Sequence, residues 1–199
     1  MKQAMLLLFP VSEYETRINN LLAGMERLNL DAVILTSDEN TYYFSGFRSI
    51  VWDSKVSTPA TLVLLRDGQL LLVTSESGQP PADATSCVTE FRTYGANSYP
   101  DYVSAIVSPL AEKRLLQGRI GFGLGAGHKL HLNYTASQAL FAALAGAEIM
   151  DIAALLWEIR SVKSPLELDK LRKSAEINCA AIAYGFDRMR EGMTEMDLY

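Results

Sequence analysis

Hydrophobic residues recur every three or four positions between residues 14 and 28, with polar residues such as Arg17 between them. This spacing predicts an amphipathic helix whose apolar face packs on a core. Ser12 followed by Glu15 matches a capping box, so we expect the helix to begin at this serine. The run at 31–36, which is continuously apolar from Ala32 to Leu35, then predicts a short strand that helices cover on both faces.

A hairpin and a series of alternating strands and helices come next. Asp67 and Gly68 separate two apolar runs, 60–65 and 70–74, and an Asp-Gly pair in this setting is a strong hairpin signal. The remaining pattern predicts, in chain order, a strand at 87–94, a helix at 99–116, a strand at 119–122, a helix at 132–144 and a strand at 148–152. Together these elements indicate an α/β fold with a mixed sheet and helices on both faces.

The pattern breaks at the polar stretch 159–165 and restarts as one long helix. Ser164, Pro165 and Glu167 supply a capping serine, a proline at the first helical position and the acid of a capping box. Apolar residues then follow at nearly heptad spacing up to residue 190: Leu168, Leu171, Ala175, Cys179, Ile182, Phe186 and Met189. A seam of this kind needs a partner surface.

Beyond this helix, Gly192 is a stop signal, and Thr194 with Asp197 has the spacing of one more helix cap. The chain ends inside the first turn of that helix, and an isolated single turn is unstable in water. We therefore expect an α/β domain at 1–160, followed at 161–199 by a linker and the first helix of a further, truncated domain.

Composition narrows the possible classes of protein. The chain of 199 residues is 49% hydrophobic and 21% charged, which is enough for one sizeable core and an appendage. A net charge of −5 argues against a nucleic-acid surface, which needs clustered Lys and Arg. The apolar run at 4–9 falls short of a signal-peptide core of about 7–15 residues, and no window approaches the roughly 20 apolar residues of a membrane span. We expect a cytoplasmic protein without a membrane or nucleic-acid partner.

Both cysteines lie in apolar surroundings. Cys87 falls in a strand-like run and Cys179 in the helical stripe, and no His or acid stands at ligand spacing around either. We expect two buried free thiols, in keeping with a reducing compartment.

Glycines and histidines near residue 125 invite two further interpretations. Four alternating glycines at 121–127 follow a strand, as in a dinucleotide-binding loop, but no βαβ unit with a following acid completes the fingerprint. His128 and His131 are spaced so that they could share a metal, but no third ligand adjoins them. We favour a loop or strand exit for the glycines and solvated loop or helix-cap positions for the histidines.

Three segments of the chain carry recognisable motifs. The first combines the strand at 31–35 with the Asn-Thr-Tyr-Tyr-Phe-Ser-Gly-Phe stretch at 40–47. The second is the Arg-x-x-Lys-Ser-Pro-x-Glu-Leu pattern at 160–168, and the third is Gly-Met-Thr-Glu at 192–195. In type and order along the chain, these segments resemble the pita-bread metallopeptidase family of prolidase, aminopeptidase P and creatinase. The resemblance implies a creatinase/prolidase-type amino-terminal domain at 1–160 and the start of a pita-bread catalytic domain at 161–199.

The resemblance also implies a function. It points to the non-catalytic, dimerising and substrate-capping domain of a metal-dependent Xaa-Pro dipeptidase or aminopeptidase that acts on peptides. Two divalent metal ions of the Mn, Co or Zn type would lie in the catalytic domain, downstream of the Gly-Met-Thr-Glu turn, so we assign no catalytic residue and no metal ligand within the chain. Two alternatives stay open: a creatinase-like hydrolase of a small C–N substrate, and a stand-alone oligomerisation or binding module.

The loop at 47–58 holds the candidate binding residues. It places Phe47, Arg48, Trp52 and Lys55 among small polar residues. The resemblance implies that this part of the domain reaches over a partner subunit's active site, where the cations would pair with a substrate carboxylate and Trp52 would form an apolar wall. The alternative is an ordinary surface loop with a partly buried Trp52.

Overall fold

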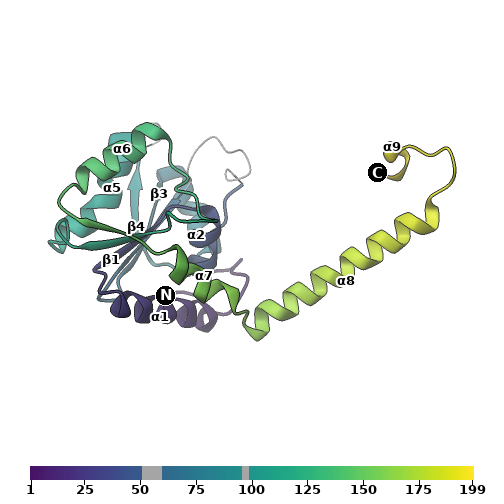
Figure 1. The fold of residues 1–199 in the computed structure, drawn as a ribbon, viewed down its shortest axis with the longest axis horizontal. Coiled ribbons are helices and arrows are strands. Elements are labelled where there is room, and N and C mark those ends of the chain that lie inside the picture. Colours follow the sequence, from purple (N-terminus) through teal and green to yellow (C-terminus); the bar gives the residue numbers. More distant parts are fainter. Residues whose placement is uncertain (51–59, 96–98) are drawn as a thin grey trace. The chain divides into compact units, whose positions relative to one another are not determined.

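The computed structural model describes residues 1–50, 60–95 and 99–199. The chain divides into two units, residues 1–159 and residues 160–199. The first unit contains the sheet and its covering helices, and the second contains one long helix and one short helix (Figure 1).

One mixed sheet of six strands runs through the first unit. In spatial order it reads β4-β3-β2-β1-β5-β6. Its strands are β1 Ala32–Leu35, β2 Ala60–Leu65, β3 Leu70–Ser75, β4 Glu90–Tyr94, β5 Arg119–Phe122 and β6 Glu148–Asp151. The pairs β1/β2 and β2/β3 are antiparallel, whereas β3/β4, β1/β5 and β5/β6 are parallel. The mixed sheet and the hairpin at 60–75 confirm the expectation from the sequence.

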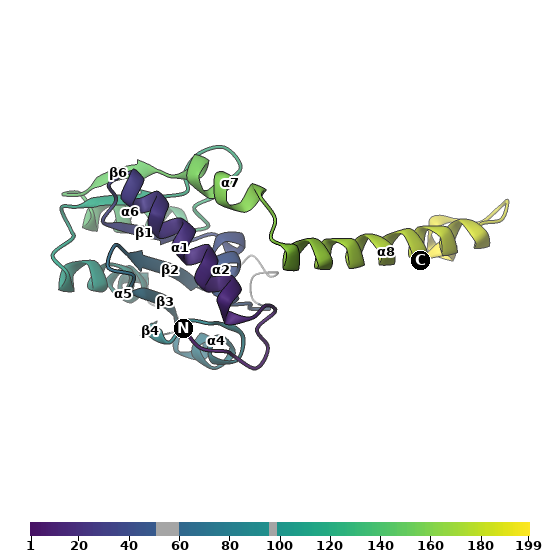
Figure 2. The same cartoon turned by 90° about the horizontal axis from the view of Figure 1, so that it is seen from below.

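Helices cover both faces of this sheet (Figure 2). Those of the first unit are α1 Val11–Arg27, α2 Asp38–Ser45, α4 Gln79–Thr85, α5 Tyr99–Glu112, α6 Tyr134–Ala143 and α7 Ala153–Ser161, with a 3₁₀ turn, η1, at Glu76–Gly78. One core cluster joins α1, α2, α4 and α7 to the sheet, and a second joins α5 and α6 to its opposite face. The predicted arrangement of helices on both faces is therefore confirmed.

Strand β1 shows why its sequence is continuously apolar. Val33 and Leu35 belong to the first core cluster, whereas Ala32 and Ile34 belong to the second. All four are buried, because side chains of a strand alternate between the faces and both faces are covered.

The start of α1 differs from the expectation. The helix begins at Val11 after Pro10, and no side-chain cap forms, so the predicted capping box of Ser12 and Glu15 is wrong. The amino-terminal segment satisfies this end instead, because the Val11 N–H donates to Oε1 of Gln3 over 3.1 Å. Proline also suits the position before a helix, where its missing N–H costs nothing.

Arg17 on α1 is buried rather than solvated on a polar face. Only 4% of it is exposed. Its guanidinium stacks near the rings of Phe9 and Tyr43, with centroid distances of 4.8 and 4.2 Å, and donates to the Tyr43 carbonyl and to Glu13. A planar, weakly hydrated cation tolerates such an aromatic site when a carboxylate pairs with it.

Two short helices were not anticipated. Helix α4 occupies residues 79–85 and α7 occupies residues 153–161, and the sequence pattern assigned no element to either stretch. The strand expected at 87–94 begins only at Glu90. Helix α4 has seven residues, and Pro80 and Pro81 in its first turn made the sequence look non-helical, although proline is well tolerated at that position. Cys87 and Val88 nevertheless stay buried, as core residues outside a strand.

The second unit contains α8 Pro165–Arg188 and α9 Glu195–Leu198. The capping box at α8 is confirmed: Ser164 and Glu167 exchange hydrogen bonds of 2.9 and 3.1 Å between their side chains and backbone N–H groups. No residue of α8 is buried. Cys179 is therefore exposed, and the expectation that both thiols are buried is wrong for this one.

The two thiols should react at very different rates. Cys87 is fully buried, and burial raises its pKa to about 12, so the reactive thiolate is scarce. We expect a maleimide to label Cys179 quickly in the native chain and Cys87 only after denaturation. Mass spectrometry of the labelled peptides measures this directly, and Cys179→Ser should abolish the fast reaction. Rapid native labelling of Cys87 would contradict the buried position.

Candidate functional site

The four candidate binding residues fall into three groups. Phe47 is wholly buried in the core of its own unit, which leaves its ring no exposed surface for a ligand. Arg48, the next residue, is exposed. Trp52 and Lys55 lie outside the described residues. The substrate-capping role of this segment stays a prediction, and Arg48 is the member that the structure places at the surface.

Helix α2 ends three residues before Arg48. The Ser37 hydroxyl caps the helix by accepting the Asn40 N–H over 3.3 Å. At the other end Gly46 has φ of +74°, a left-handed conformation that favours glycine, and its N–H donates to the Tyr42 carbonyl. From the sequence, the aromatic stretch at 41–47 predicts a turn or short helix that Gly46 closes with a sharp exit, and α2 confirms the short helix.

Three hydroxyl groups surround this exit, and we call Ser45, Thr85 and Ser86 the hydroxyl collar. Ser45 Oγ accepts the Phe47 N–H over 3.1 Å, and Ser86 Oγ donates to the Ser45 carbonyl over 3.0 Å. Thr85 Oγ1 accepts the Arg48 N–H over 3.3 Å. The collar therefore joins the end of α2 to the end of α4, about forty residues along the chain.

Gly46 also lies where a side chain has no room. A Cβ at Gly46 would approach Leu7 Cδ1 to 2.5 Å and the Thr85 carbonyl oxygen to 3.0 Å. Gly68 has a similar φ of +87° but no atom within 4 Å of such a Cβ. The two glycines thus share a backbone requirement and differ in their surroundings.

Alanine substitutions at these glycines should separate the two costs. Gly68→Ala should destabilise the chain by about 1–2 kcal/mol through the left-handed backbone alone. Gly46→Ala should cost roughly 1–3 kcal/mol more, because the added methyl group overpacks against Leu7 and Thr85. Urea denaturation of both variants measures the difference. Equal losses would show that the close contacts relax without cost.

A second cluster lies at the carboxyl ends of β1 and β5. These strands are parallel neighbours, and their connections leave in opposite directions, through α2 to β2 and through α6 to β6. Such switch points are where open α/β sheets bind ligands. Here side chains of the two connections contact one another, since His128 Nδ1 lies 3.2 Å from Asn40 Nδ2 and His131 Nδ1 lies 2.8 Å from Asp38 Oδ1.

The two histidines contact separate side chains in the first turn of α2 through their Nδ1 atoms, and His131 has φ of +46°. The expectation of solvated loop or helix-cap positions did not include these contacts, because the spacing of the histidines could not reveal partners about ninety positions away. Within the residues that the structure describes, no group of three or more His, Cys, Asp or Glu side chains could hold a metal ion.

The glycine loop after β5 wraps around an acid of its own chain. Asp151 Oδ1 accepts the N–H groups of Leu124 and Gly125, each over 3.0 Å, and that of Ala153 over 2.9 Å. Backbone N–H groups of this kind would have to contact the pyrophosphate of a dinucleotide. Strands β5 and β6 with α6 between them form a parallel βαβ unit that ends in Asp151, so the expectation that no such unit follows the glycines is wrong. Because Asp151 itself occupies two of the loop's N–H groups, the loop geometry still does not support nucleotide binding.

Asp151 is expected to make the stability of the first unit pH-dependent. Burial alone would raise its pKa, but the backbone N–H groups and nearby His128 outweigh burial and hold the pKa below the ordinary value of 3.8. A depressed folded pKa contributes stability above the unfolded pKa, and this contribution disappears as the pH falls through the folded pKa.

We expect Asp151→Asn to lower the free energy of unfolding by about 1 kcal/mol near neutral pH, because the hydrogen bonds lose their charge assistance. The difference from the unmodified chain should narrow as the pH falls below 3.8 and through the folded pKa, where the carboxylate itself becomes protonated. Chemical denaturation near neutral pH and over a series of acidic pH values measures this. A difference that does not change with pH would show that the charge of Asp151 is unimportant.

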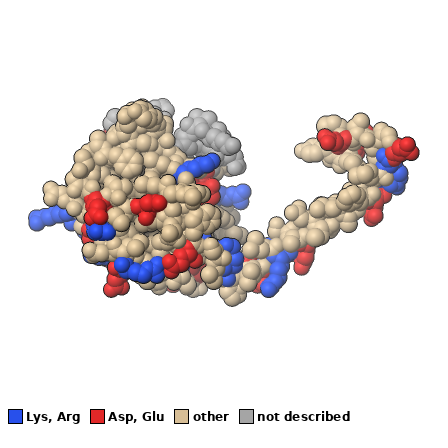
Figure 3. Space-filling view, viewed as in Figure 1, with Lys and Arg blue, Asp and Glu red and all other residues tan. Residues whose placement is uncertain are grey.

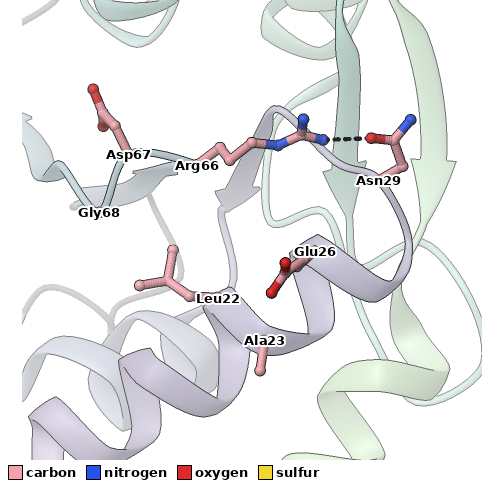
Figure 4. Close-up of a pocket in the computed structure, with 7 residues that line it drawn as sticks. All are labelled: Leu22, Ala23, Glu26, Asn29, Arg66, Asp67 and Gly68. Atoms are coloured by element: carbon pink, nitrogen blue, oxygen red, sulfur yellow. Dashed lines mark hydrogen bonds between the residues drawn. The ribbon is translucent and has the colours of Figure 1, made fainter.

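A shallow hollow of about 540 Å³ lies between α1 and the β2–β3 turn (Figure 4). The residues around it are Leu22, Ala23, Glu26, Asn29, Arg66, Asp67 and Gly68. Arg66 donates to the Leu30 carbonyl and to Asn29 Oδ1, over 2.7 and 2.9 Å, and pairs with Asp31. All three nitrogens of its guanidinium thus fasten the hairpin to the end of α1, which indicates a structural role.

Charged side chains of both signs are interspersed on the face of the first unit seen in Figure 3. Several form exposed pairs, including Arg27 with Glu158 and Arg119 with Glu148. No described helix is long and apolar enough to cross a membrane.

Comparison with known sequences identifies the family. The profile of the creatinase/prolidase N-terminal domain matches residues 17–162. The chain therefore belongs to the creatinase/prolidase N-terminal domain family. An uncharacterized peptidase of Staphylococcus aureus is 24% identical over 185 residues, which are 92% of this chain and 47% of that protein. An uncharacterized hydrolase/peptidase of Sinorhizobium fredii is 26% identical over 96% of this chain and 48% of its own length.

Solved structures share the same fold. A prolidase from Thermococcus sibiricus matches with a TM-score of 0.74 at 16% identity, over 93% of this chain and 47% of that chain. An Xaa-Pro dipeptidase from Bacillus anthracis matches with a TM-score of 0.72 at 18% identity, over 93% and 46%. An Xaa-Pro aminopeptidase chain from Streptococcus pyogenes matches over its whole length and 76% of this chain, with a TM-score of 0.58 at 19% identity. The chain spans about half the length of the curated relatives that it matches.

Proposed function

We propose that the chain is the non-catalytic amino-terminal part of a metal-dependent Xaa-Pro peptidase, in which it forms a dimer and caps the substrate. The observation that carries this proposal is the family match over residues 17–162, joined to relatives of which the chain covers about half. Two of those relatives are described as peptidases, and the similar structures include a prolidase and an Xaa-Pro dipeptidase. The parent protein would be cytoplasmic.

Substrate capping would depend on the segment that leaves α2. Arg48 is exposed directly after a residue fixed in the core, so its guanidinium is available at a defined point of the surface. A planar guanidinium suits a peptide carboxylate, which it can bind through two parallel hydrogen bonds. Trp52 and Lys55 are proposed from the sequence to complete this contact with the partner subunit's substrate.

The metal chemistry would belong to a catalytic domain beyond residue 199. Among the described side chains no group of three or more has the composition and geometry to hold a metal ion, so the described residues do not fit the two divalent ions that the family implies. We assign no step of the reaction to this chain.

Two other functions each have one observation in their favour. The matching family includes creatinase in its description, which favours a hydrolase of a small C–N substrate. The Streptococcus pyogenes chain is matched over 100% of its length, which favours a module that is stable by itself. Both share the fold, and the fold does not distinguish their chemistry.

The purified 199-residue chain should not hydrolyse Xaa-Pro dipeptides, with or without added Mn²⁺, Co²⁺ or Zn²⁺. The physical reason is the lack of a clustered set of acids and histidines in the described residues, without which no metal-activated water can form. Release of proline measured by chromatography decides the point. Reproducible turnover that survives further purification would place the catalytic groups in this chain.

Arg48→Ala should weaken substrate binding in the full-length peptidase. If Arg48 pairs with a substrate carboxylate, its removal should raise KM about tenfold for Xaa-Pro substrates, while the stability of the fold changes by only about 0.5 kcal/mol. Steady-state kinetics on dipeptides and on creatine test the two chemistries together. Unchanged KM on every substrate would exclude a capping role for Arg48.

A further inference from the structure

We propose that Thr85 is a positioning residue for Arg48, acting through the backbone N–H of the arginine. This inference rests on the proposed function, because it concerns how the backbone of Arg48, the residue proposed to cap the substrate, is held. Thr85 lies at the end of α4, far from Arg48 in sequence, and neither the family match nor the sequence pattern assigns it a role.

Two members of the hydroxyl collar, Ser45 and Thr85, have a defined hydrogen-bond direction. Ser45 Oγ donates to the Thr41 carbonyl, so its lone pairs are free to accept the Phe47 N–H. Thr85 Oγ1 donates to the Pro81 carbonyl over 2.8 Å, which turns its lone pairs toward the Arg48 N–H. Because the proton of each hydroxyl is committed, each can only accept from the exit segment.

These contacts define two successive anchors on the backbone. Phe47 is fixed by its buried ring and by its N–H on Ser45. Arg48 is fixed by its N–H on Thr85, and from there its side chain enters solvent. Thr85 is thus the last described contact between the core of the unit and the backbone of the exposed arginine.

The position of Thr85 makes it a clean probe. Ser45 and Ser86 are fully buried, so changes there would disturb the core. Thr85 is half-buried at the end of a short helix, and valine reproduces its shape without the hydroxyl. Thr89, four residues further on, is exposed, so Thr89→Val serves as a control that removes a threonine hydroxyl outside the collar.

The kinetic test uses the full-length peptidase and five variants: Thr85→Val, Thr85→Ser, Thr89→Val, Arg48→Ala and the double variant Arg48→Ala/Thr85→Val. We expect Thr85→Val to raise KM for an Xaa-Pro dipeptide about fivefold with little change in kcat, which is the loss of one neutral hydrogen bond. Thr85→Ser keeps the hydroxyl and should therefore leave the KM close to that of the unmodified enzyme, as should Thr89→Val. The double variant should match Arg48→Ala alone, because Thr85 acts only through that side chain.

A second measurement does not depend on catalysis. In the 199-residue chain, Thr85→Val should accelerate hydrogen exchange of the Arg48 amide about fivefold, as followed by NMR, while Thr89→Val should not. The two readings together fix the mechanism: a kinetic effect without an exchange effect would overturn the backbone route.

The outcomes separate the inference from the function on which it rests. If Arg48→Ala raises KM and Thr85→Val does not, Thr85 is not a positioning residue and the capping proposal stands. If Arg48→Ala itself leaves KM unchanged, both are wrong. If the effects of Arg48→Ala and Thr85→Val multiply in the double variant, Thr85 acts by a general loss of structure, which also overturns the inference.

Discussion

Burial of the central strands on both faces is the constraint on which the rest of the first unit depends. A strand with both faces covered cannot offer polar side chains to water, so the polar side chains that make specific hydrogen bonds lie at the strand ends and the helix termini. The hydroxyl collar, the histidine contacts at the start of α2 and the hydrogen bonds of Asp151 all lie at such ends. The exposed Arg48 is accordingly held by a hydroxyl at the edge of the core and not by the sheet itself.

The sequence predicted the parts of the fold that local rules govern. The Asp67-Gly68 hairpin, the apolar strand β1 and the capping box of Ser164 depend on neighbours in the chain, and all three are confirmed. The capping box predicted at Ser12 does not form, because Gln3 binds the first N–H group of the helix instead. Arg17 was predicted to lie on a polar face, whereas the folded core places it among aromatic rings that are distant in sequence.

The candidate site was accessible to the sequence only in part. Gly46 could be recognised because a left-handed residue at a helix end leaves a local signature. Phe47 was expected to bind a ligand, and its burial in the core depends on packing that the sequence pattern does not show. The assignment of Thr85 and Ser86 to the same site required the packing of α4 against α2, and no spacing rule links residues so far apart. The partners of His128 and His131 escaped notice for the same reason.

The loop that Asp151 organises carries an internal substitute for the anion that such glycine-rich turns attract in other proteins. The carboxylate is tethered to the end of β6, so a free phosphate would compete against a group of high effective concentration and not against water. The backbone N–H groups of Leu124 and Gly125 keep an arrangement that suits an oxyanion, and the fold itself supplies that oxyanion from β6.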